Sequence, residues 1–364
     1  MTKRLVVCCD GTWNRPDQRA GSAAPTNVTK IALGVPPEDD DGASQLLYYQ
    51  QGVGTRRFEH FSGGAFALGL SRNVQDCYRF LVESYEPGDA LYFFGFSRGA
   101  FTARSLAGLV RNSGILRSQH ADRIKEAYSL YRSRANQAKP RGVDAQIFRR
   151  MYSHEDPEIH FIGVWDTVGS LGIPVPVPFL NKLVNRRWGF HDTALSSRVR
   201  FAYHALAIDE KRVPFEPTLW KGQAHSTDQT LEQVWFAGVH SDVGGGYHEP
   251  ELAEIALLWM VDRARHAGLT FKSDYFQRAP DGVDDQLRRL GAQVAPDALG
   301  KIHESLEGVF RVAPHHPRTL TGVDGGAVAS SAVRRREELD DYNPPGLDAY
   351  LAARPRVTDV QDSP

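Results

Sequence analysis

Short apolar runs rich in β-branched and aromatic residues alternate with helix-like segments along much of the chain. Each run ends at a polar or glycine-rich turn, which is typical of buried parallel strands that lead into loops. The runs are Arg4–Cys9, Leu46–Gln50, Ala90–Phe94, Ile159–Trp165 and Gln233–Val239. Between Pro250 and Gly268, apolar residues recur at the spacing of one helix face. This alternation predicts an α/β fold, with a mostly parallel central sheet flanked by helices.

Two regions interrupt the alternation. Ile115–Glu158 is charged and helix-prone, and its basic residues are predicted to form a solvated helical face rather than a nucleic-acid patch. Residues 171–230 contain the proline-interrupted apolar segment Ile173–Leu180 and are predicted to form a cap. We therefore expect a single domain over residues 1–350, with insertions at about 115–158 and 171–230, and a polar tail over residues 351–364.

The composition of the 364 residues is that of a folded protein, with 41% hydrophobic and 24% charged residues. Lys and Arg (43) balance Asp and Glu (44), so no chain-wide basic surface favours nucleic acid as a partner. The apolar run near the N-terminus is too short for a signal peptide, and no uninterrupted apolar stretch reaches the ~20 residues of a membrane-spanning helix. The sequence predicts a protein that is cytoplasmic as synthesised and is compatible with export by a dedicated secretion system, and it gives no oligomeric state.

The sharpest chemical signal is Gly95-Phe96-Ser97-Arg98-Gly99, which lies between the apolar run Ala90–Phe94 and the helix-prone Phe101–Leu109. A strand that turns sharply into a helix places the middle residue in a strained backbone conformation, and flanking glycines relieve the crowding around it. The motif therefore predicts a nucleophilic serine, Ser97, exposed at the carboxyl end of a strand.

A serine hydroxyl needs a base to take its proton and a carboxylate to orient that base. Asp166 and His240 each follow a predicted strand, at the point where the strand meets its loop. The order Ser97, Asp166, His240 is the nucleophile, acid, histidine order of α/β hydrolases. We therefore predict an α/β-hydrolase-like fold in which these three residues form a catalytic triad.

The acid has alternatives. Asp242 lies only two residues from His240, and a carboxylate in that loop is better suited to fixing the loop or capping the next helix. Asp192 and Asp209 are further candidates. Asp166 is preferred over all three because it follows a strand.

Two backbone N–H groups are candidates for the oxyanion hole, those of Arg98 and Gly11, which follow the nucleophile and the first strand. Asp10 after an apolar strand also resembles the aspartyl nucleophile of a phosphatase, which would use a metal. That interpretation expects a second carboxylate at the position of Cys8.

Six blocks together resemble an uncharacterised α/β-hydrolase domain family that includes the type VI secretion phospholipase effectors. They are Cys9–Asn14, Gln51–Thr55, Gly95–Ala100, Val164–Gly169, Phe236–Tyr247 and the closing Tyr342–Leu347. The resemblance extends from Lys3 to about Leu347, and it implies hydrolysis of phospholipid ester bonds. By motif, the family's serine, aspartate and histidine fall on Ser97, Asp166 and His240.

The sequence thus predicts a serine hydrolase that cleaves carboxylic esters, with a lipid as its substrate and no metal or organic cofactor. Residues 173–190 combine apolar side chains with cations and Trp188, a composition suited to peripheral contact with an anionic membrane surface. The alternatives are a catalytically silent hydrolase fold that binds a partner, and a metal-dependent phosphoester hydrolase that uses Asp10.

Overall fold

The computed structural model describes residues 2–11, 24–52, 63–169, 194–222, 229–279, 284–306, 311, 314–353, 355–360 and 362. The predicted membrane-contact segment 173–190 and the candidate acid Asp192 lie outside these residues. Among the described residues, no helix combines the length and the apolar composition needed to cross a bilayer.

An eight-stranded sheet forms the centre of the molecule, and all of its neighbouring strands pair in parallel. In spatial order its strands are β12 (Val357–Thr358), β11 (Gly326–Ala329), β8 (Thr230–Phe236), β7 (Val199–Ala207), β6 (Ile159–Trp165), β3 (Ala90–Phe96), β1 (Arg4–Cys9) and β2 (Gln45–Gln50). The predicted α/β fold with a mostly parallel central sheet is confirmed.

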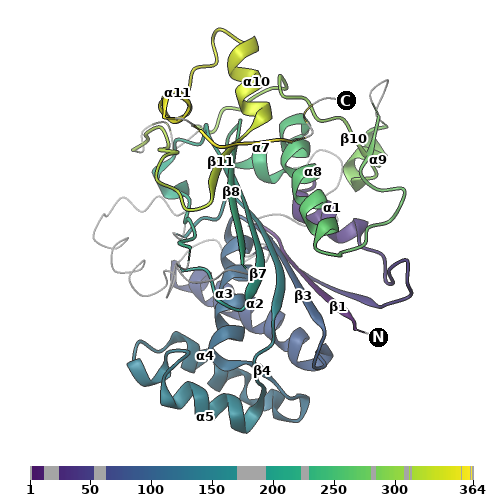
Figure 1. Cartoon of the computed structure of the whole chain (residues 1–364), viewed down its shortest axis with the longest axis vertical. Coiled ribbons are helices and arrows are strands. Elements are labelled where there is room, and N and C mark those ends of the chain that lie inside the picture. Colours follow the sequence, from purple (N-terminus) through teal and green to yellow (C-terminus); the bar gives the residue numbers. More distant parts are fainter. Residues whose placement is uncertain are drawn as a thin grey trace.

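Helices cover both faces of the sheet (Figure 1). On one face lie α1 (Asn27–Gly34) and α8 (Glu251–His266), and on the other α2 (Gly63–Ser84) and α3 (Arg98–Ser113). The alternation of side chains along β1 shows why both faces need a cover. Val6 and Cys8 join the apolar cluster under α1 and α8, whereas Leu5, Val7 and Cys9 join the cluster under α3.

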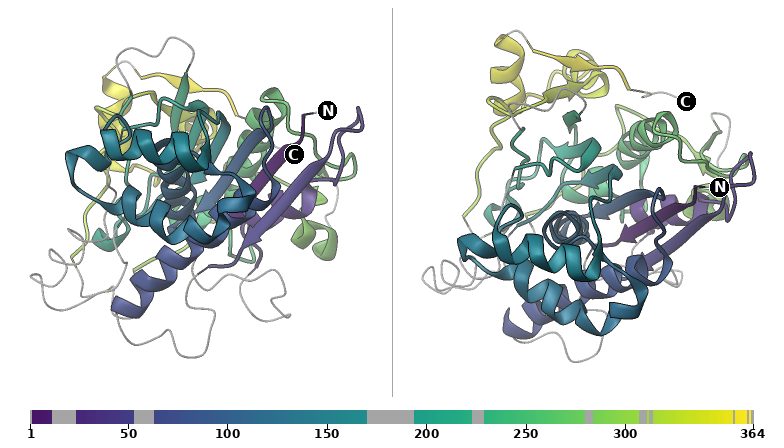
Figure 2. Two further views of the ribbon diagram at one scale, coloured as in Figure 1. Left: turned by 90° about the horizontal axis from the view of Figure 1, so that it is seen from below. Right: turned by 60° about the horizontal axis from the view of Figure 1, so that its bottom comes forward.

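The remaining elements flank these layers. Between α3 and β6 lie β4 (Ile115–Leu116), η1 (Ser118–Arg123), α4 (Ile124–Arg132), η2 (Asn136–Ala138), α5 (Val143–Tyr152) and β5 (Ser153–His154). The helices α4 and α5 lie at one end of the molecule, at the bottom of Figure 1, and this end comes forward in Figure 2. After β7 come η3 (Val213–Phe215), α7 (His240–Gly244), β9 (Gln277–Arg278), α9 (Asp285–Leu290), β10 (Gln293–Val294), α10 (Ser330–Glu338) and α11 (Pro345–Ala352).

The structure differs from the sequence prediction in the region 171–230. This region was expected to form a cap, but it contains β7, which lies in the middle of the sheet between β6 and β8. The strand is hard to recognise because it carries His204 in its buried half. His204 Nε2 accepts from the N–H of Thr167 at 3.1 Å, and Nδ1 lies 3.3 Å from Oε1 of Gln233 on β8. Burial lowers the pKa of His204 to about 3, so the ring is neutral and its hydrogen bonds replace those with water.

The end of the chain also differs from prediction. Val357 and Thr358, in the expected polar tail, form the edge strand β12 beside β11. Val360 packs in the apolar cluster under α8. At least this part of the tail is therefore built into the fold.

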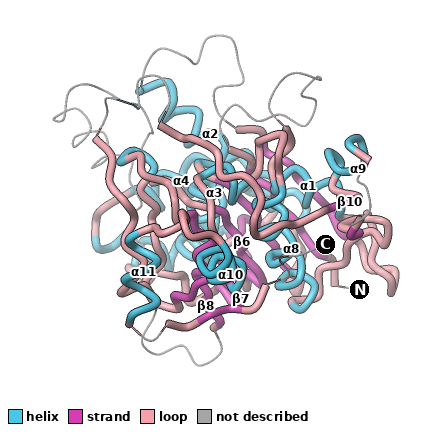
Figure 3. Tube along the Cα trace, turned by 90° about the horizontal axis from the view of Figure 1, so that it is seen from above, coloured by secondary structure: helices cyan, strands magenta, loops and turns pink. Residues whose placement is uncertain are grey.

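The strand order reverses direction at β1, which lies between β2 and β3. In open parallel sheets, ligands bind beyond the carboxyl ends of the strands at such a reversal. Figure 3 shows the strands and helices in a view from above. The loops that follow β1 and β3 therefore mark the place to look for a site, and they contain Asp10 and Ser97.

Candidate active site

Ser97 occupies a strained turn between β3 and α3, and it is buried there rather than exposed as predicted. Its φ of 57° and ψ of −118° lie in a region that residues other than glycine rarely adopt. A Cβ atom at Gly95 would lie 2.6 Å from the carbonyl oxygen of Gly99, and a Cβ at Gly99 would lie 2.0 Å from that of Cys9. Only glycine fits at both positions, because the start of α3 is in backbone contact with β3 at Gly95 and with β1 at Gly99.

The backbone of Ser97 is tied to the exit of β6. Its N–H donates to the carbonyl of Trp165 at 3.0 Å, and its carbonyl accepts from the N–H of Val168 at 3.4 Å. Asp166 lies between these two residues, with a φ of 37° and a fully buried carboxylate. The exit of β7 completes the frame, since the N–H of Ala207 donates to Oδ1 of Asp166 at 3.2 Å.

His240 begins α7, and its Nδ1 lies 2.6 Å from Oδ2 of Asp166. Its ring centroid is 4.7 Å from that of Phe96, the residue before Ser97. The structure thus brings Asp166 and His240 into direct contact and places the His240 ring against the neighbour of Ser97. Among the described residues, the hydrogen bonds of Ser97 are those of its backbone. In enzymes without bound substrate, the hydrogen bond between a catalytic serine hydroxyl and its base is commonly long or absent.

The protonation of His240 suits a base. Burial lowers the pKa of His240 below 6.5, and the hydrogen bond and charge of Asp166 offset this only in part. The ring is therefore neutral at pH 7. In the neutral tautomer that satisfies Asp166, Nδ1–H donates to Oδ2, and Nε2 keeps the lone pair that can accept a proton.

Arg318 is a residue of the candidate site that the sequence analysis missed. Its Nη1 donates to Oδ1 of Asp166 at 2.6 Å and its Nη2 to Oδ2 at 3.0 Å, a bidentate pair. The same guanidinium donates to the carbonyls of Ala207 and Phe215 at 2.7 and 2.6 Å. Burial by itself would raise the pKa of Asp166, but Arg318 and His240 together hold it well below its ordinary value. The acid is therefore ionised at every physiological pH.

Two of the alternative acids are hydrogen-bonded to groups other than the His240 ring. Asp242 accepts from the N–H of Val239 at 3.0 Å and lies 2.6 Å from Nδ1 of His303, so it fixes the loop after β8. Asp209 accepts from the N–H of Gly238 and the hydroxyl of Tyr342. Asp166 is the one of these three aspartates that is hydrogen-bonded to His240.

Glu210 supports the backbone of His240, whose N–H lies 3.3 Å from Oε2. Its carboxylate is fully buried and forms a bidentate pair with Arg212 at 2.8 and 2.7 Å. The sequence analysis also missed this pair, which holds the start of α7 in place.

Asp10 is surrounded by donors. Its carboxylate accepts from the N–H of Gly11 at 2.6 Å and from the hydroxyls of Thr26, Thr29 and Tyr49. These donors occupy both oxygens, an arrangement that suits a loop anchor better than a nucleophile or a metal ligand. The N–H of Gly11, expected in the oxyanion hole, is directed to Asp10 in this structure.

Comparison with known proteins finds a family model that matches most of the chain. Residues 3–263 match the family model described as "T6SS, Phospholipase effector Tle1-like, catalytic domain". A curated relative, Uncharacterized protein YEL023C of Saccharomyces cerevisiae, is 31% identical over 235 residues. The match covers 59% of this chain and 32% of the relative, so the chain spans about a third of that protein's length.

Two solved structures are similar to this one. The first, an uncharacterized protein from Pseudomonas aeruginosa, has a TM-score of 0.46 and 18% identity, covering 81% of this chain and 49% of that chain. The second is the Tle1 effector bound to the VgrG spike from the Type 6 secretion system, with a TM-score of 0.37 and 19% identity, covering 68% of this chain and 51% of that chain.

Proposed function

Because the chain belongs to the family of Tle1-like catalytic domains of type VI secretion phospholipase effectors, we propose that it cleaves a carboxylic ester bond of a lipid, with Ser97 as the nucleophile. The observation that carries the proposal is the pair of His240 and Asp166, 2.6 Å apart, beside the strained turn at Ser97. Family membership supports a lipid substrate, and the geometry supports the serine mechanism.

In this mechanism, Nε2 of His240 takes the proton of the Ser97 hydroxyl as its oxygen attacks the ester carbonyl. The imidazolium then protonates the leaving alcohol, and water hydrolyses the acyl-enzyme by the same route. Asp166 holds the ring in the correct tautomer through Nδ1 and stabilises the imidazolium that forms. Arg318 keeps Asp166 ionised and fixes both of its oxygens.

The oxyanion that forms on the substrate needs backbone donors. Arg98 opens α3, so its N–H lies at the positive end of the helix dipole and directly after the nucleophile. Gly11 serves as a second donor only when its N–H leaves Oδ1 of Asp10. We therefore assign the N–H of Arg98 as the first donor. The N–H of Gly11 becomes the second donor only if substrate binding releases it from Asp10.

A fluorophosphonate probe, which reacts with activated serines, tests the mechanism. We expect the wild-type protein to be labelled on Ser97 and Ser97→Ala to remain unlabelled. Ser118→Ala is the matched control, because Ser118 is exposed and lies outside the site. Labelling of the Ser97→Ala variant at the wild-type rate would exclude Ser97 as the nucleophile, and an unlabelled wild type would favour a silent fold.

The bond that is cleaved is tested by mass spectrometry of products from mixed phospholipids and short p-nitrophenyl esters. Release of fatty acid and lysophospholipid supports acyl-ester cleavage. Release of phosphate or a phosphorylated headgroup would instead support phosphoester hydrolysis.

A further inference from the structure

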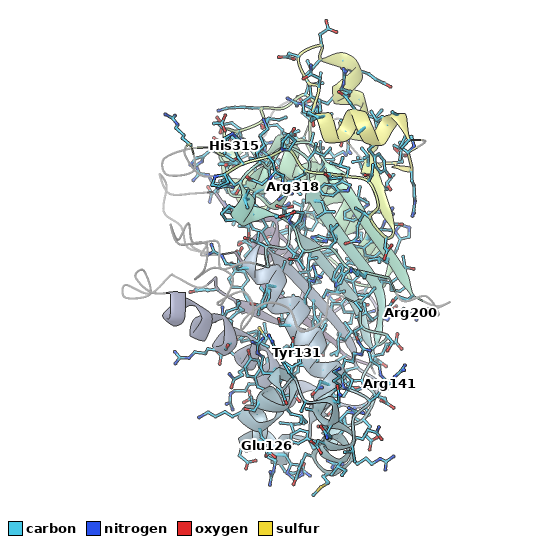
Figure 4. All side chains as sticks on the ribbon, turned by 90° about the vertical axis from the view of Figure 1, so that its left-hand side faces the viewer. Glu126, Tyr131, Arg141, Arg200, His315 and Arg318 are labelled. Carbon is cyan, nitrogen blue, oxygen red and sulfur yellow. The ribbon has the colours of Figure 1, made fainter. Side chains whose placement is uncertain are left out.

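A cavity of 680 Å³ lies along α3, well away from Ser97. The residues of α3 that line it begin at Arg104 and end at Asn112, seven to fifteen positions beyond Ser97. At 1.5 Å per residue, this places the cavity roughly 10 to 22 Å from Ser97 along the helix. In Figure 4, Tyr131 and Arg141 of the cavity lie in the lower half of the molecule, whereas Arg318, which binds Asp166, lies in the upper half.

The polar part of the cavity lining is strongly basic. Five of the described lining residues are cations, and none is Asp or Glu. The cations are Arg104, Arg111, Arg134, Lys139 and Arg141. The whole chain has a formal charge of −1, so this concentration of one sign is local. Several cations around one cavity attract an anion, and arginine in particular pairs with phosphate oxygens.

The rim of the cavity is held in a defined conformation. Asn112 donates through Nδ2 to the carbonyl of Ala138 at 2.8 Å, and Gly142 donates through its N–H to the carbonyl of Lys139 at 2.7 Å. A Cβ at Gly142 would lie 2.1 Å from the carbonyl oxygen of Gln137, which shows how tightly the loop is folded. Lys139 and Arg141 are exposed on this loop, and among the described residues no carboxylate forms an ion pair with either.

The buried floor of the cavity is mostly apolar, although Arg104 is buried there as well. It includes Ile162 of β6, Val199 of β7 and the neighbouring Leu195 and Trp220. Arg104 lies over the ring of Trp220, with 4.5 Å between the guanidinium carbon and the ring centroid. An apolar floor below a basic rim is suited to a molecule with an apolar tail and an anionic head, and the volume is within the range of small-molecule sites.

We propose that this cavity binds the phosphate group of an anionic amphiphile, with Lys139 and Arg141 at the phosphate and the tail on the apolar floor. The sequence analysis assigned the basic residues of Arg132–Arg150 to a solvated face, whereas this proposal gives some of them a role in binding a ligand. The proposal does not depend on the ester hydrolysis proposed above, because it concerns residues outside the triad.

Calorimetric titration of the full chain with monomeric dodecyl phosphate tests the proposal, and inorganic phosphate and uncharged dodecyl maltoside are the comparison ligands. Dodecyl phosphate contains no carboxylic ester, so binding is measured without turnover. We expect it to bind at least tenfold more tightly than either comparison ligand, and we expect added salt to weaken it. Equal affinity for inorganic phosphate would overturn the role of the tail, and equal affinity for the maltoside would overturn the role of the phosphate.

Variants locate the site. Lys139→Gln with Arg141→Gln should weaken dodecyl phosphate at least tenfold, because both cations face the proposed phosphate. Lys125→Gln with Arg150→Gln is the matched control, since these exposed cations belong to the same insertion but do not line the cavity, and it should bind within twofold of wild type. Equal loss in both double variants, or none in the first, would overturn the assignment. Fluorophosphonate labelling of Ser97 should be unchanged in both, which separates this test from that of the hydrolase.

Discussion

The carboxylate of Asp166 lies between the guanidinium of Arg318 and the imidazole of His240, so the order of magnitude of the repulsion between these two groups follows from the distances. Nη2 of Arg318 and Nδ1 of His240 bind the same oxygen, Oδ2, at 3.0 and 2.6 Å. The two nitrogens are therefore at most about 5.6 Å apart. At an effective dielectric constant of about 20, two unit charges at that distance repel by about 3 kcal/mol, which corresponds to about two pH units. Arg318 thus disfavours the protonated form of His240.

Arg318→Met removes this charge and keeps much of the side-chain volume. We expect the pKa of His240 to rise in the variant, because Asp166 then stabilises the imidazolium without opposition from Arg318. Since the base must be neutral to act, a higher pKa means that activity is lost at a higher pH than in the wild type. The acid limb of kcat/KM against pH should move upward by about one to two units. The plateau should also fall, because Asp166 loses two of its hydrogen bonds.

The assay is hydrolysis of a short p-nitrophenyl ester, with the product quantified after quenching to one alkaline pH. Arg318→Lys should keep the limb near its wild-type position while lowering the plateau, because it retains a charge but not the bidentate geometry. Added guanidinium should restore part of the plateau in Arg318→Met.

Arg335→Met is the matched control for loss of a buried arginine. Its guanidinium donates to the carbonyls of Ala298 and Gly300 and does not contact Asp166. This variant should lose thermal stability without moving the limb. An unmoved or lowered limb in a folded Arg318→Met protein would refute the electrostatic role and leave Arg318 a structural residue.

The remaining predictions concern the acid, the turn and the segment 173–190. Asp166→Asn should lower turnover about 10⁴-fold, because the amide favours the wrong tautomer of His240, whereas Asp242→Asn should mainly lower the melting temperature; kinetics and thermal melts that show the reverse would exchange their roles. Gly99→Ala should yield little folded protein, because its Cβ would meet the Cys9 carbonyl at 2.0 Å; a native circular dichroism spectrum and melting curve would contradict this. Phe179→Ser with Leu180→Ser should reduce hydrolysis of anionic vesicles far more than that of a soluble ester, and equal losses would show that these side chains do not sense lipid.

Much of the sheet could be predicted because a strand buried on both faces needs apolar residues at nearly every position. Arg4–Cys9 and Ile159–Trp165 have that composition, and the structure places β1 and β6 over the same residues. The turn at Ser97 was also predictable, because two glycines at fixed spacing are a local requirement of its geometry. β7 was not, since the cost of burying His204 is offset by Gln233 and Thr167, which are distant in sequence.

Arg318 could not be predicted either, because its partner is even more distant in sequence. It is one of 43 basic residues, and 152 positions separate it from Asp166. The family match ends at residue 263, so it includes the proposed triad and leaves out the arginine paired with its acid. The segment around Arg318 is nevertheless firmly attached: His316 donates through its N–H to the carbonyl of Lys211 at 3.0 Å, and a Cβ at Gly346 would lie 2.2 Å from the carbonyl oxygen of Arg318. The residues after 263 therefore do more than cover the sheet, because they supply a cation that lowers the pKa of Asp166. Under the proposed mechanism, that cation also influences the pH range in which His240 acts as a base.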